Sequence, residues 1–460
     1  MRIVLCGVTG MRNRGVDALV TCHIDGLLSS LADARFDVLT QTADYDAMRL
    51  AGRPANAIDV GPMYLTMGSR LRRALTHIPR YRPRGSVGWD DARESVYGAD
   101  AVIATGGDLF SSTYGYLNTY LSPLKLAIDR GIPIALSAQS IGPFERSEEI
   151  DSFLRVARHA RVITVRERFS YEYATRNLGL PPEQIELVAD PAVMLPAAPT
   201  GDALLAHYGL PPGRPFVAVA PSQAISDWGN ADRAAHASAL RAVVVEILER
   251  FDADVILVPH VDSTYAQNMD AVCAMTLLRD LNFNPRVRVA CGEHTPSEYK
   301  AIIARADMVI AERMHAAIAA FSSGACALCV GYSVKARGIV DGFLGEGAAA
   351  EGWVVPVADF SDPTEAVRRV RWAWDRRVET GDRLRLRLPS VRRLAEHNFD
   401  VLARRLGFPA TRERTVHGGS GGGEGAPRSG PRARNASAEL EGDRAAPLSS
   451  VAGQRNAIAT

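Results

Sequence analysis

Short apolar runs rich in valine and isoleucine alternate with helical patterns along most of the chain. Runs of this length are typical of strands buried on both faces, and their alternation with helices is typical of parallel sheets covered by helices. The pattern therefore predicts an α/β protein with two series of parallel strands. The runs are residues 2–6, 36–42, 101–105, 134–139, 162–166 and 185–190, and then 216–222, 254–261, 287–291, 308–312 and 327–332.

A segment rich in proline and glycine, residues 195–215, separates the two series and is interpreted as the connection between two domains. Helical patterns at 363–379 and 383–407 follow the second series. Two α/β domains that face each other would leave a cleft between them. The predicted regions are two domains over 1–200 and 201–345, closing helices over 346–410, and a disordered tail over 411–460 that is rich in Gly, Ser, Pro and Arg.

Composition restricts the setting in which the protein works. The 460 residues are 47% hydrophobic with a formal net charge of +1, which gives no overall argument for binding nucleic acid or a membrane. Six scattered cysteines, mostly in apolar runs, favour free thiols in a reducing cytoplasm over a disulfide framework. The first residues do not resemble a signal peptide, and no apolar run is long enough to span a bilayer. We therefore expect a cytoplasmic protein, without a metal site.

An arginine and a histidine stand between two apolar segments in MVIAERMHAAIAAFSSGA, residues 308–325. If the first segment is a strand and the second a helix that ends at Gly324, Arg313 and His315 lie in the turn between them. That turn is at the carboxyl end of a parallel strand, where open α/β sheets bind ligands, and beside a helix N-terminus. The helix would bury Met314, Ala317, Ile318 and Phe321.

Two interpretations of this turn remain open. Arginine offers a planar pair of donors to a carboxylate or phosphate, and histidine transfers protons, so the turn is suited to an anion site with an acid beside it. The alternative is that Arg313 pairs with Asp307 or Glu312 and that His315 is a surface residue with satisfied hydrogen bonds.

Glycines and polar side chains also follow other predicted strands. Glycine lets a ligand approach the backbone, although tight turns explain two glycines equally well. A histidine at such a position is a second candidate acid or base. Together these positions favour one site shared by both halves. They are Asn13, Gly106, Gly107, Asp108, Gln139, Ser140, Arg166 and His260.

Eight short segments follow one another along the chain in a fixed order. They are GVTGMRNRGVDAL, AVIATGGDLF, ALSAQSIGPF, VRERFS, VADPAVML, VPHVDS, ERMHAAIAA and GYSVKARGI. In these segments and in their order, the chain resembles the polysaccharide pyruvyl transferase family over roughly residues 1–345. The resemblance implies two Rossmann-like domains in a GT-B-like arrangement with an interdomain cleft, the first on the acceptor side and the second on the donor side. It also implies transfer of a pyruvyl group from phosphoenolpyruvate onto sugar hydroxyls of a polysaccharide or glycolipid precursor, usually as a cyclic ketal.

By position, Arg313 and His315 look like the donor-binding and catalytic pair of the family, with Arg166 and His260 in support. Phosphoenolpyruvate carries a carboxylate and a phosphate, so that Arg313 and Arg166 would hold its anions while His315 protonates its methylene carbon. His260 would act as base or orient its partner. Lys335 would reach the phosphate, or is a solvated lysine at a helix start. This chemistry requires no cofactor and no metal.

The remaining strand-end residues, Asn13, Gly106, Gly107, Asp108, Gln139 and Ser140, would line the acceptor side of the cleft. Two other functions stay open beside pyruvyl transfer. A GT-B glycosyltransferase would use the same architecture with a nucleotide-sugar donor, and an inactive glycan-binding homologue would tolerate substitution of Arg313 and His315.

One segment suggests a partner of a different kind. Residues 60–89 contain no acidic side chain, and arginines accumulate from Arg70 to Arg84 among Met and Leu residues. Such a segment would rest on the inner face of an anionic membrane or contact a lipid-linked glycan. The alternative is a solvated loop.

Overall fold

The structure is a computed structural model that describes residues 1–60, 87–113, 117–210, 212–262, 268–331 and 333–408. These residues all belong to one compact unit, Met1–Thr411. The segment from Arg70 to Arg84, for which membrane contact is predicted, and the tail predicted to be disordered lie outside the described residues.

The first half of the chain forms an eight-stranded sheet with the strand order β3-β2-β1-β4-β6-β7-β8, in which β5 pairs with β6. Its strands are β1 (Arg2–Cys6), β2 (Arg35–Thr40), β3 (Ala55–Asp59), β4 (Ala101–Ala104), β5 (Gly107–Phe110), β6 (Ile134–Ile141), β7 (Ala160–Val165) and β8 (Ile185–Leu187). Its helices are α1 (Arg14–Ser30), α2 (Ala43–Leu50), α4 (Val87–Tyr97), α5 (Leu117–Asp129), α6 (Ser147–Ala157) and α7 (Arg168–Glu172), followed by the short turns η3 (Tyr173–Asn177), η4 (Pro182–Gln184) and η5 (Pro191–Met194).

The second half forms a six-stranded sheet with the order β11-β10-β9-β12-β13-β14. Its strands are β9 (Phe216–Ala220), β10 (Asp254–Leu257), β11 (Val287–Val289), β12 (Met308–Ala311), β13 (Ala327–Gly331) and β14 (Val354–Pro356). Its helices are α8 (Gly201–His207), α9 (Ile225–Trp228), α10 (Arg233–Arg250), α11 (Asp270–Asp280), α12 (Pro296–Ile303), α13 (Met314–Ser322), α14 (Val334–Leu344), α15 (Val357–Phe360) and α16 (Pro363–Asp375), with the turn η7 (Ala349–Trp353) after α14.

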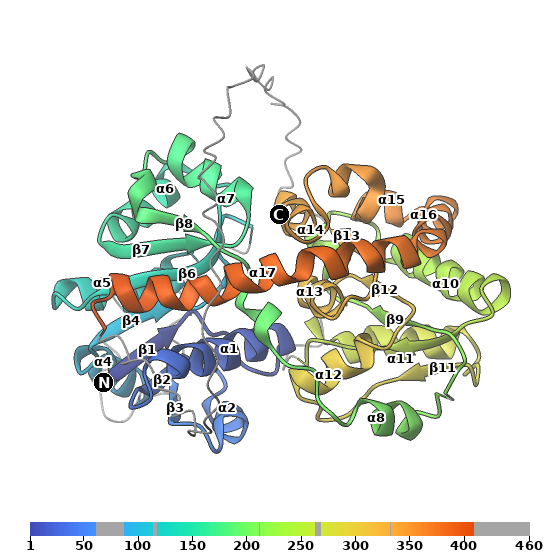
Figure 1. The fold of residues 1–460 in the computed structure, drawn as a ribbon, viewed down its shortest axis with the longest axis horizontal. Helices are drawn as coiled ribbons and strands as arrows, with labels where there is room; N and C mark the ends of the chain where they lie inside the picture. Colours follow the sequence, from blue (N-terminus) through green and yellow to red (C-terminus); the bar gives the residue numbers. More distant parts are fainter. Residues whose placement is uncertain (61–86, 114–116, 211, 263–267, 332, 409–460) are drawn as a thin grey trace, which may run out of the picture. The chain divides into compact units, whose positions relative to one another are not determined.

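Both sheets are parallel and are covered by helices on both faces (Figure 1). The apolar strand sequences explain this architecture, because alternate residues pack on opposite faces: Val4 belongs to one buried cluster, whereas Ile3 and Leu5 belong to another. The strand order reverses between β1 and β4 in the first sheet and between β9 and β12 in the second. Such switch points are where open α/β sheets bind ligands.

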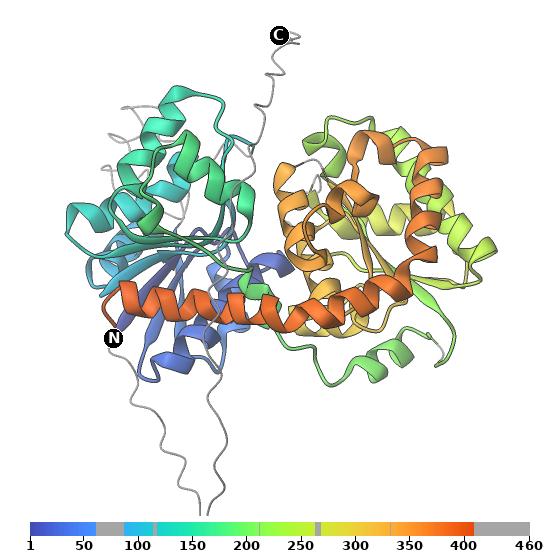
Figure 2. The ribbon, with the colours of Figure 1, turned by 45° about the horizontal axis from the view of Figure 1, so that its top comes forward.

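A long final helix, α17 (Arg377–Arg405), runs along elements of both halves (Figures 1 and 2). In its C-terminal part the buried Asn398 accepts hydrogen bonds from Thr164 Oγ1 at 2.6 Å and Ser137 Oγ at 3.4 Å, in strands of the first sheet. In its middle part Arg392 donates to the Ser322 carbonyl of α13 at 3.3 Å. The helix therefore binds the two halves together.

Every predicted strand is present, and the two helical patterns after the second series correspond to α16 and α17. Strands β3, β5 and β14 were not predicted from the sequence. β3 and β14 are short edge strands, and β5 begins in a glycine turn, so that none has the continuous apolar run on which the prediction depends.

Candidate functional site

The N-terminal ends of two helices meet at His315. Helix α1 begins after Asn13, whose side chain accepts a hydrogen bond from Gly15 N at 3.0 Å, and α13 begins after Arg313. Gly15 lies against the imidazole ring, since a Cβ atom at this position would overlap Nδ1 of His315. The predicted turn thus places His315 where a helix of the first sheet meets a helix of the second, and both helix N-termini favour negative charge there.

The His315 ring is partly exposed, but its Nε2 atom is buried and has no hydrogen-bond partner among the described residues. The nearest carboxylate oxygen that pairs with it is Asp190 Oδ2, at 3.9 Å. Burial lowers the pKa of His315, Asp190 acts against that shift, and Arg166 adds to it. The neutral ring is therefore favoured in this structure, and Asp190 is the group that favours its protonation.

Arg166 lies beside this pair, at the carboxyl end of β7. Its Nε atom donates to Ser140 Oγ at 2.8 Å, and its Nη1 atom donates to Asp190 Oδ2 at 2.6 Å. Both partners of this ion pair are buried, with side-chain exposures of 5% and 2%. Burial alone would raise the pKa of Asp190, but Arg166 and His315 outweigh it and keep the pKa below its usual value. Asp190 is therefore ionised.

Lys335 is buried at the start of α14 and forms an ion pair with the partly exposed Asp108 of β5. Burial lowers the pKa of Lys335, and the Asp108 carboxylate acts in the opposite direction. The two glycines before Asp108 allow close packing: Gly107 has a φ angle of +124°, and a Cβ on Gly106 would lie 3.1 Å from the Ala138 carbonyl oxygen. Lys335 is thus a paired, buried cation and not a solvated lysine.

Gln139 is fully buried in β6, and its amide group donates hydrogen bonds to carbonyl oxygens of β4 and β6. Its Nε2 atom donates to the Ala104 and Ser137 carbonyl oxygens at 3.2 and 3.1 Å, as well as to that of Thr105. Its Oε1 atom has no partner among the described residues. The side chain therefore holds β4 and β6 together close to Arg166, instead of pointing into open space.

Arg313 binds a buried acid that sequence reasoning did not single out. Its guanidinium donates to both oxygens of Asp270, at 3.0 and 2.6 Å, and to Asn268 Oδ1 at 2.9 Å. The two acids proposed as its alternative partners have other partners. Asp307 accepts from Phe216 N at 2.9 Å, and Glu312 accepts from Ser222 N at 2.7 Å.

His260 lies at the other side of the same site. Its ring stacks on Tyr299 with a centroid distance of 5.3 Å, and its Nδ1 atom donates to the Val258 carbonyl oxygen at 2.8 Å. Burial lowers its pKa to about 4, so that the ring is neutral near neutral pH. The backbone carbonyl of His260 accepts from Arg14 N at 2.9 Å, which joins it to the first turn of α1.

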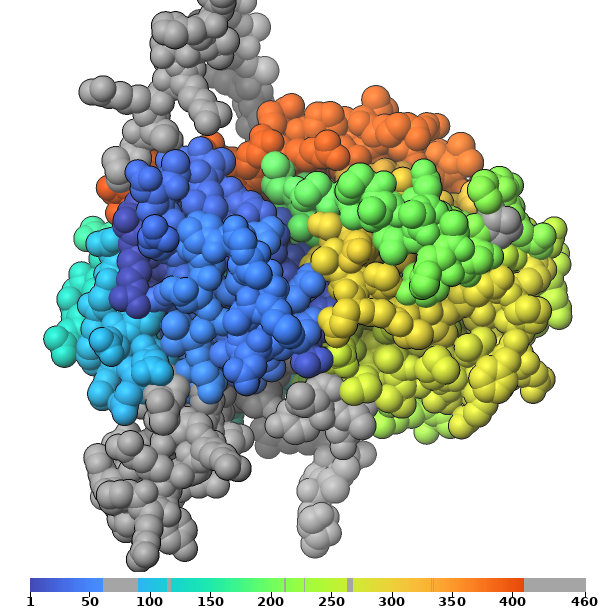
Figure 3. Space-filling view, turned by 90° about the horizontal axis from the view of Figure 1, so that it is seen from below, coloured from blue at the N-terminus to red at the C-terminus, as the bar shows by residue number. Residues whose placement is uncertain are grey.

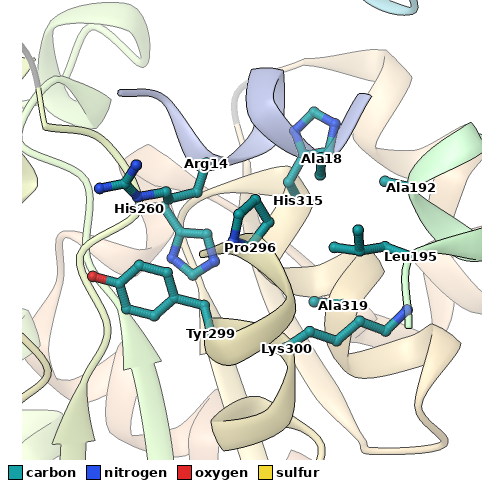
Figure 4. A pocket seen from close by; sticks show the side chains of 10 residues that line it. All are labelled: Arg14, Ala18, Ala192, Leu195, His260, Pro296, Tyr299, Lys300, His315 and Ala319. Carbon is teal, nitrogen blue, oxygen red and sulfur yellow. The ribbon is translucent and has the colours of Figure 1, made fainter. Parts of the chain in front are cut away.

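A cavity of about 20 Å³ lies between these elements (Figure 4). Its wall includes His260, His315, Tyr299 and Lys300. In Figure 4 Arg14 also borders the cavity, but its side chain extends away from the His315 ring. Lys300 is buried, and its Nζ atom has a long hydrogen bond of 3.4 Å to the Val193 carbonyl oxygen. Burial lowers its pKa to about 8.

The two halves also meet through polar contacts next to this cavity. Arg14 Nη1 donates to the Tyr45 hydroxyl at 2.6 Å, and this hydroxyl donates to Glu293 Oε2 at 2.8 Å. Arg12 pairs with Asp262 at 2.9 Å. In the space-filling view the blue N-terminal segment abuts the yellow segment of the second half without a gap (Figure 3).

Sequence reasoning missed Gly15, Asp190, Asp270 and Lys300. Asp190 is the last residue of the segment 185–190, which was interpreted as a strand, and Asp270 begins a helix instead of following a strand. Lys300 did carry a signal, because the chain has only three lysines and this one follows the pattern of a buried helix face.

The described residues contain no group of three His, Cys, Asp or Glu side chains arranged to hold a metal ion. None of the described helices has the length and apolar character needed to cross a membrane.

Comparison with known proteins identifies a family and a fold. The family model described as polysaccharide pyruvyl transferase matches residues 13–334, which is more than half of the chain. No curated protein sequence matches.

Solved structures match over most of the chain at low identity. UDP-GlcNAc 2-epimerase from Neisseria meningitidis, bound to UDP-GlcNAc, is 12% identical with a TM-score of 0.55, and the match covers 88% of this chain and 100% of that one. HepE from Anabaena, in complex with UDP-glucose, is 11% identical with a TM-score of 0.55 and coverages of 88% and 99%. These likenesses show the fold, and they confirm the predicted GT-B-like pair of Rossmann-like domains.

Proposed function

Because the chain belongs to the polysaccharide pyruvyl transferase family, we propose that it transfers the pyruvyl group of phosphoenolpyruvate onto hydroxyls of a sugar acceptor and forms a pyruvate ketal. The acceptor is a polysaccharide or glycolipid precursor, and the reaction takes place in the cytoplasm. The proposal includes no metal and no cofactor, since protonation and hydroxyl attack are sufficient for the chemistry.

One observation carries the proposal: two buried cationic side chains from the two halves of the chain, Arg166 and Lys335, lie near each other, and Arg166 is linked to His315 through Asp190. Arg166 follows β7 of the first sheet and pairs with the buried Asp190, and Lys335 lies in the first turn of α14 in the second half and pairs with the partly exposed Asp108. Phosphoenolpyruvate has two anionic groups on one small carbon skeleton, so its site needs two cationic donors close to one acid. Arg166 and Lys335 are assigned to the anions, and His315 is assigned to the acid.

The proposed reaction balances in protons. His315 protonates the methylene carbon, a first sugar hydroxyl attacks the central carbon, and a base takes the proton of that hydroxyl. A second hydroxyl then displaces phosphate at the same carbon, and its proton leaves with the phosphate. His260 suits the base, because its ring is neutral and Nδ1 donates to Val258, which leaves the lone pair on Nε2.

Arg313 receives an indirect role in this scheme. Its guanidinium is engaged by both oxygens of Asp270, and Asp270 Oδ2 also accepts from the backbone N–H of His260 at 3.2 Å. Arg313 thereby fixes the loop that carries His260.

A nucleotide-sugar glycosyltransferase is the alternative on the same fold, but the turn after β9 disfavours it. The backbone N–H of Ser222 donates to Glu312 Oε2 at 2.7 Å, and that of Gln223 donates to Asp270 Oδ1 at 3.1 Å. These N–H groups lie at the switch point of the second sheet, where a donor diphosphate would use them. Each of these N–H groups has a single hydrogen, which a carboxylate of the chain already accepts, whereas the Arg166 guanidinium and the Lys335 ammonium group have more N–H donors than their bonds to Ser140, Asp190 and Asp108 use.

Calorimetric titration with phosphoenolpyruvate and, separately, UDP-glucose tests the proposal. Wild type and Lys125→Ala, a matched lysine control distant from the site residues in the sequence, are expected to bind phosphoenolpyruvate, whereas Lys335→Ala loses at least tenfold in affinity. Binding of phosphoenolpyruvate that Lys335→Ala retains would refute the site assignment. Binding of UDP-glucose without binding of phosphoenolpyruvate would refute the reaction, and failure to bind either ligand would favour the inactive glycan-binding homologue.

A further inference from the structure

Burial creates a difficulty for the proposed acid. A general acid must be protonated when it acts, but burial favours the neutral ring of His315. The Arg166 guanidinium adds to the difficulty. The other titratable side chains that line the cavity, Arg14, Lys300, His260 and Tyr299, include no carboxylate that would offset it. Some group must offset them if His315 is to carry a proton at a useful pH.

Asp190 has the position and the charge for this task. Its Oδ2 atom lies 3.9 Å from the buried Nε2 atom of His315. Among the described titratable groups that shift the protonation of His315 or line the cavity, Asp190 is the carboxylate that pairs with the ring. It is the N-terminal cap of η5, in the segment that leads from the first sheet to the second. It is thus contributed from outside the element that carries His315.

The carboxylate is also rigidly held. Oδ1 accepts from Ala192 N at 2.8 Å, and Oδ2 accepts from Arg166 at 2.6 Å, so that both oxygens are fixed by bonds that do not involve His315. The ring is fixed from its other side, where Nδ1 lies against Gly15. Neither partner can move far from the other without breaking one of these contacts, which is the arrangement of a preorganised charge.

We propose that Asp190 is a positioning residue of the site: its carboxylate stabilises the imidazolium form of His315 through Nε2 and orients Arg166 with the same oxygen. The inference rests on the proposed function, in which His315 is the acid. According to this proposal, Asp190 alone positions both the anion-binding Arg166 and the acid His315. The Nε2 side of the ring faces Asp190, and Nδ1 faces the first turn of α1.

Titration of the histidine rings by NMR tests this assignment without any substrate. The protein is labelled with ¹⁵N-histidine, and the His315 signals are assigned by their loss in His315→Asn. In Asp190→Asn the His315 midpoint is expected to move to lower pH by about one unit, because an opposite charge within 4–6 Å has been removed. Asp190→Glu keeps the carboxylate and is expected to restore most of the shift.

Two controls separate the charge of Asp190 from a general disturbance. Asp232→Asn makes the same exchange at the N-terminal cap of α10 and is expected to leave the His315 midpoint unchanged. Ser140→Ala removes the other side-chain partner of Arg166 but keeps the Asp190 carboxylate, so its His315 midpoint is expected to stay close to that of wild type.

Two results would overturn the assignment: a His315 midpoint in Asp190→Asn equal to that of wild type, or a shift in Ser140→Ala as large as that in Asp190→Asn. If Asp190→Asn does not fold, Asp190→Ser, which also removes the carboxylate, takes its place in the same comparison with Asp190→Glu and Ser140→Ala. The titration needs no phosphoenolpyruvate. A failure of the proposed reaction would appear in the calorimetry instead, with the His315 shift intact.

Discussion

The absence of a side chain at Gly15 determines where His315 can lie. A Cβ atom there would overlap Nδ1 of the ring, so Gly15→Ala forces the histidine away from Asp190 and from the N-terminus of α1. We expect a loss of about 1–3 kcal/mol in the free energy of unfolding, typical of overpacking, and a fall of at least tenfold in phosphoenolpyruvate-dependent phosphate release. Urea unfolding and a phosphate assay measure the two effects.

Gly342→Ala is the matched control for this substitution. Gly342 lies in helix α14 with no positive φ angle, and apart from its chain neighbours and the backbone of its own helix no described atom lies within 4 Å of the position that an added methyl group would take. Alanine there should stabilise the protein by up to about 1 kcal/mol, because it restricts the unfolded chain and favours the helix. If Gly15→Ala behaved like Gly342→Ala in both assays, the close approach of His315 would have no functional consequence.

Lys300 gives the protein a stability that depends on pH. Its pKa is about 8 in the folded protein, below the value of 10.5 that the exposed side chain has. Between these values the unfolded chain binds more protons than the folded one, so the stability contributed by this residue rises with pH. Below pH 8 the buried charge destabilises the fold by roughly 3 kcal/mol, the equivalent of that shift.

Lys300→Met removes the buried charge and keeps an apolar side chain of similar length. We expect the variant to be more stable than wild type at pH 7, by about 2 kcal/mol after the loss of the hydrogen bond to Val193. The advantage should shrink as the pH rises from 8 towards 10.5. Urea unfolding at pH 7 and pH 9.5 measures this, and a variant less stable than wild type at pH 7 would contradict the prediction.

At the scale of elements, the sequence predicts positions better than it predicts partners. Arg166, His260 and Arg313 each follow an apolar run of valine and isoleucine, and the rule that ligands bind at strand ends is sufficient to find them. Their partners Asp190 and Asp270 come from a connecting segment and from a helix start. Asp190 is the last residue of the predicted strand run 185–190, whereas Asp270 has no such signal. Neither partnership can be predicted from the sequence, because the contact is created by the packing of segments far apart in the chain.

Helix α17 also contains a residue whose partners the sequence does not predict. Its apolar period predicts a helix, but the pattern does not reveal that Asn398 is fully buried against the first sheet. There the amide accepts from Thr164 Oγ1 and donates to Ser137 Oγ at 3.1 Å. A polar residue on the apolar face of a helix is explained only when the hydroxyl groups of β6 and β7 are seen opposite it.

Asn398→Ala tests how strongly this contact anchors α17. The substitution removes one partner from each of two buried hydroxyl groups, leaves the Thr164 O–H without its acceptor and creates a small cavity, so we expect a loss of about 2–4 kcal/mol in the free energy of unfolding. Leu386→Ala, on the same helix with an exposed fraction of 84%, should change stability by less than about 0.5 kcal/mol. Urea unfolding compares the two, and equal effects would show that α17 is not anchored at Asn398.

At the scale of the whole described unit, the site depends on contacts that join the two sheets. Sequence reasoning predicts two domains with polar strand ends, but it does not predict which residues connect them. The side-chain contacts that join the two halves are of two kinds, one exposed and one involving a buried residue. The side chains of the Arg12–Asp262 ion pair are 35% and 41% exposed, so this pair contributes little. The Tyr45 hydroxyl, in contrast, links the buried Arg14 to Glu293.

Tyr45→Phe removes that one hydroxyl and leaves the ring in place, so it weakens the connection without a cavity. The backbone bonds beside it also join the halves, since Arg14 N donates to the His260 carbonyl and Asp262 N to the Arg12 carbonyl. We expect faster hydrogen exchange at these two amides and unchanged exchange in β6, as measured by mass spectrometry. Tyr97→Phe is the control, because it removes the hydroxyl of a tyrosine whose ring contacts Arg130.

Opening at these two amides should also weaken phosphoenolpyruvate binding several-fold, because Arg14 N and His260 lie next to His315. Faster exchange throughout the protein would instead indicate a general loss of stability, and unchanged exchange would show that the Tyr45 hydroxyl does not join the sheets.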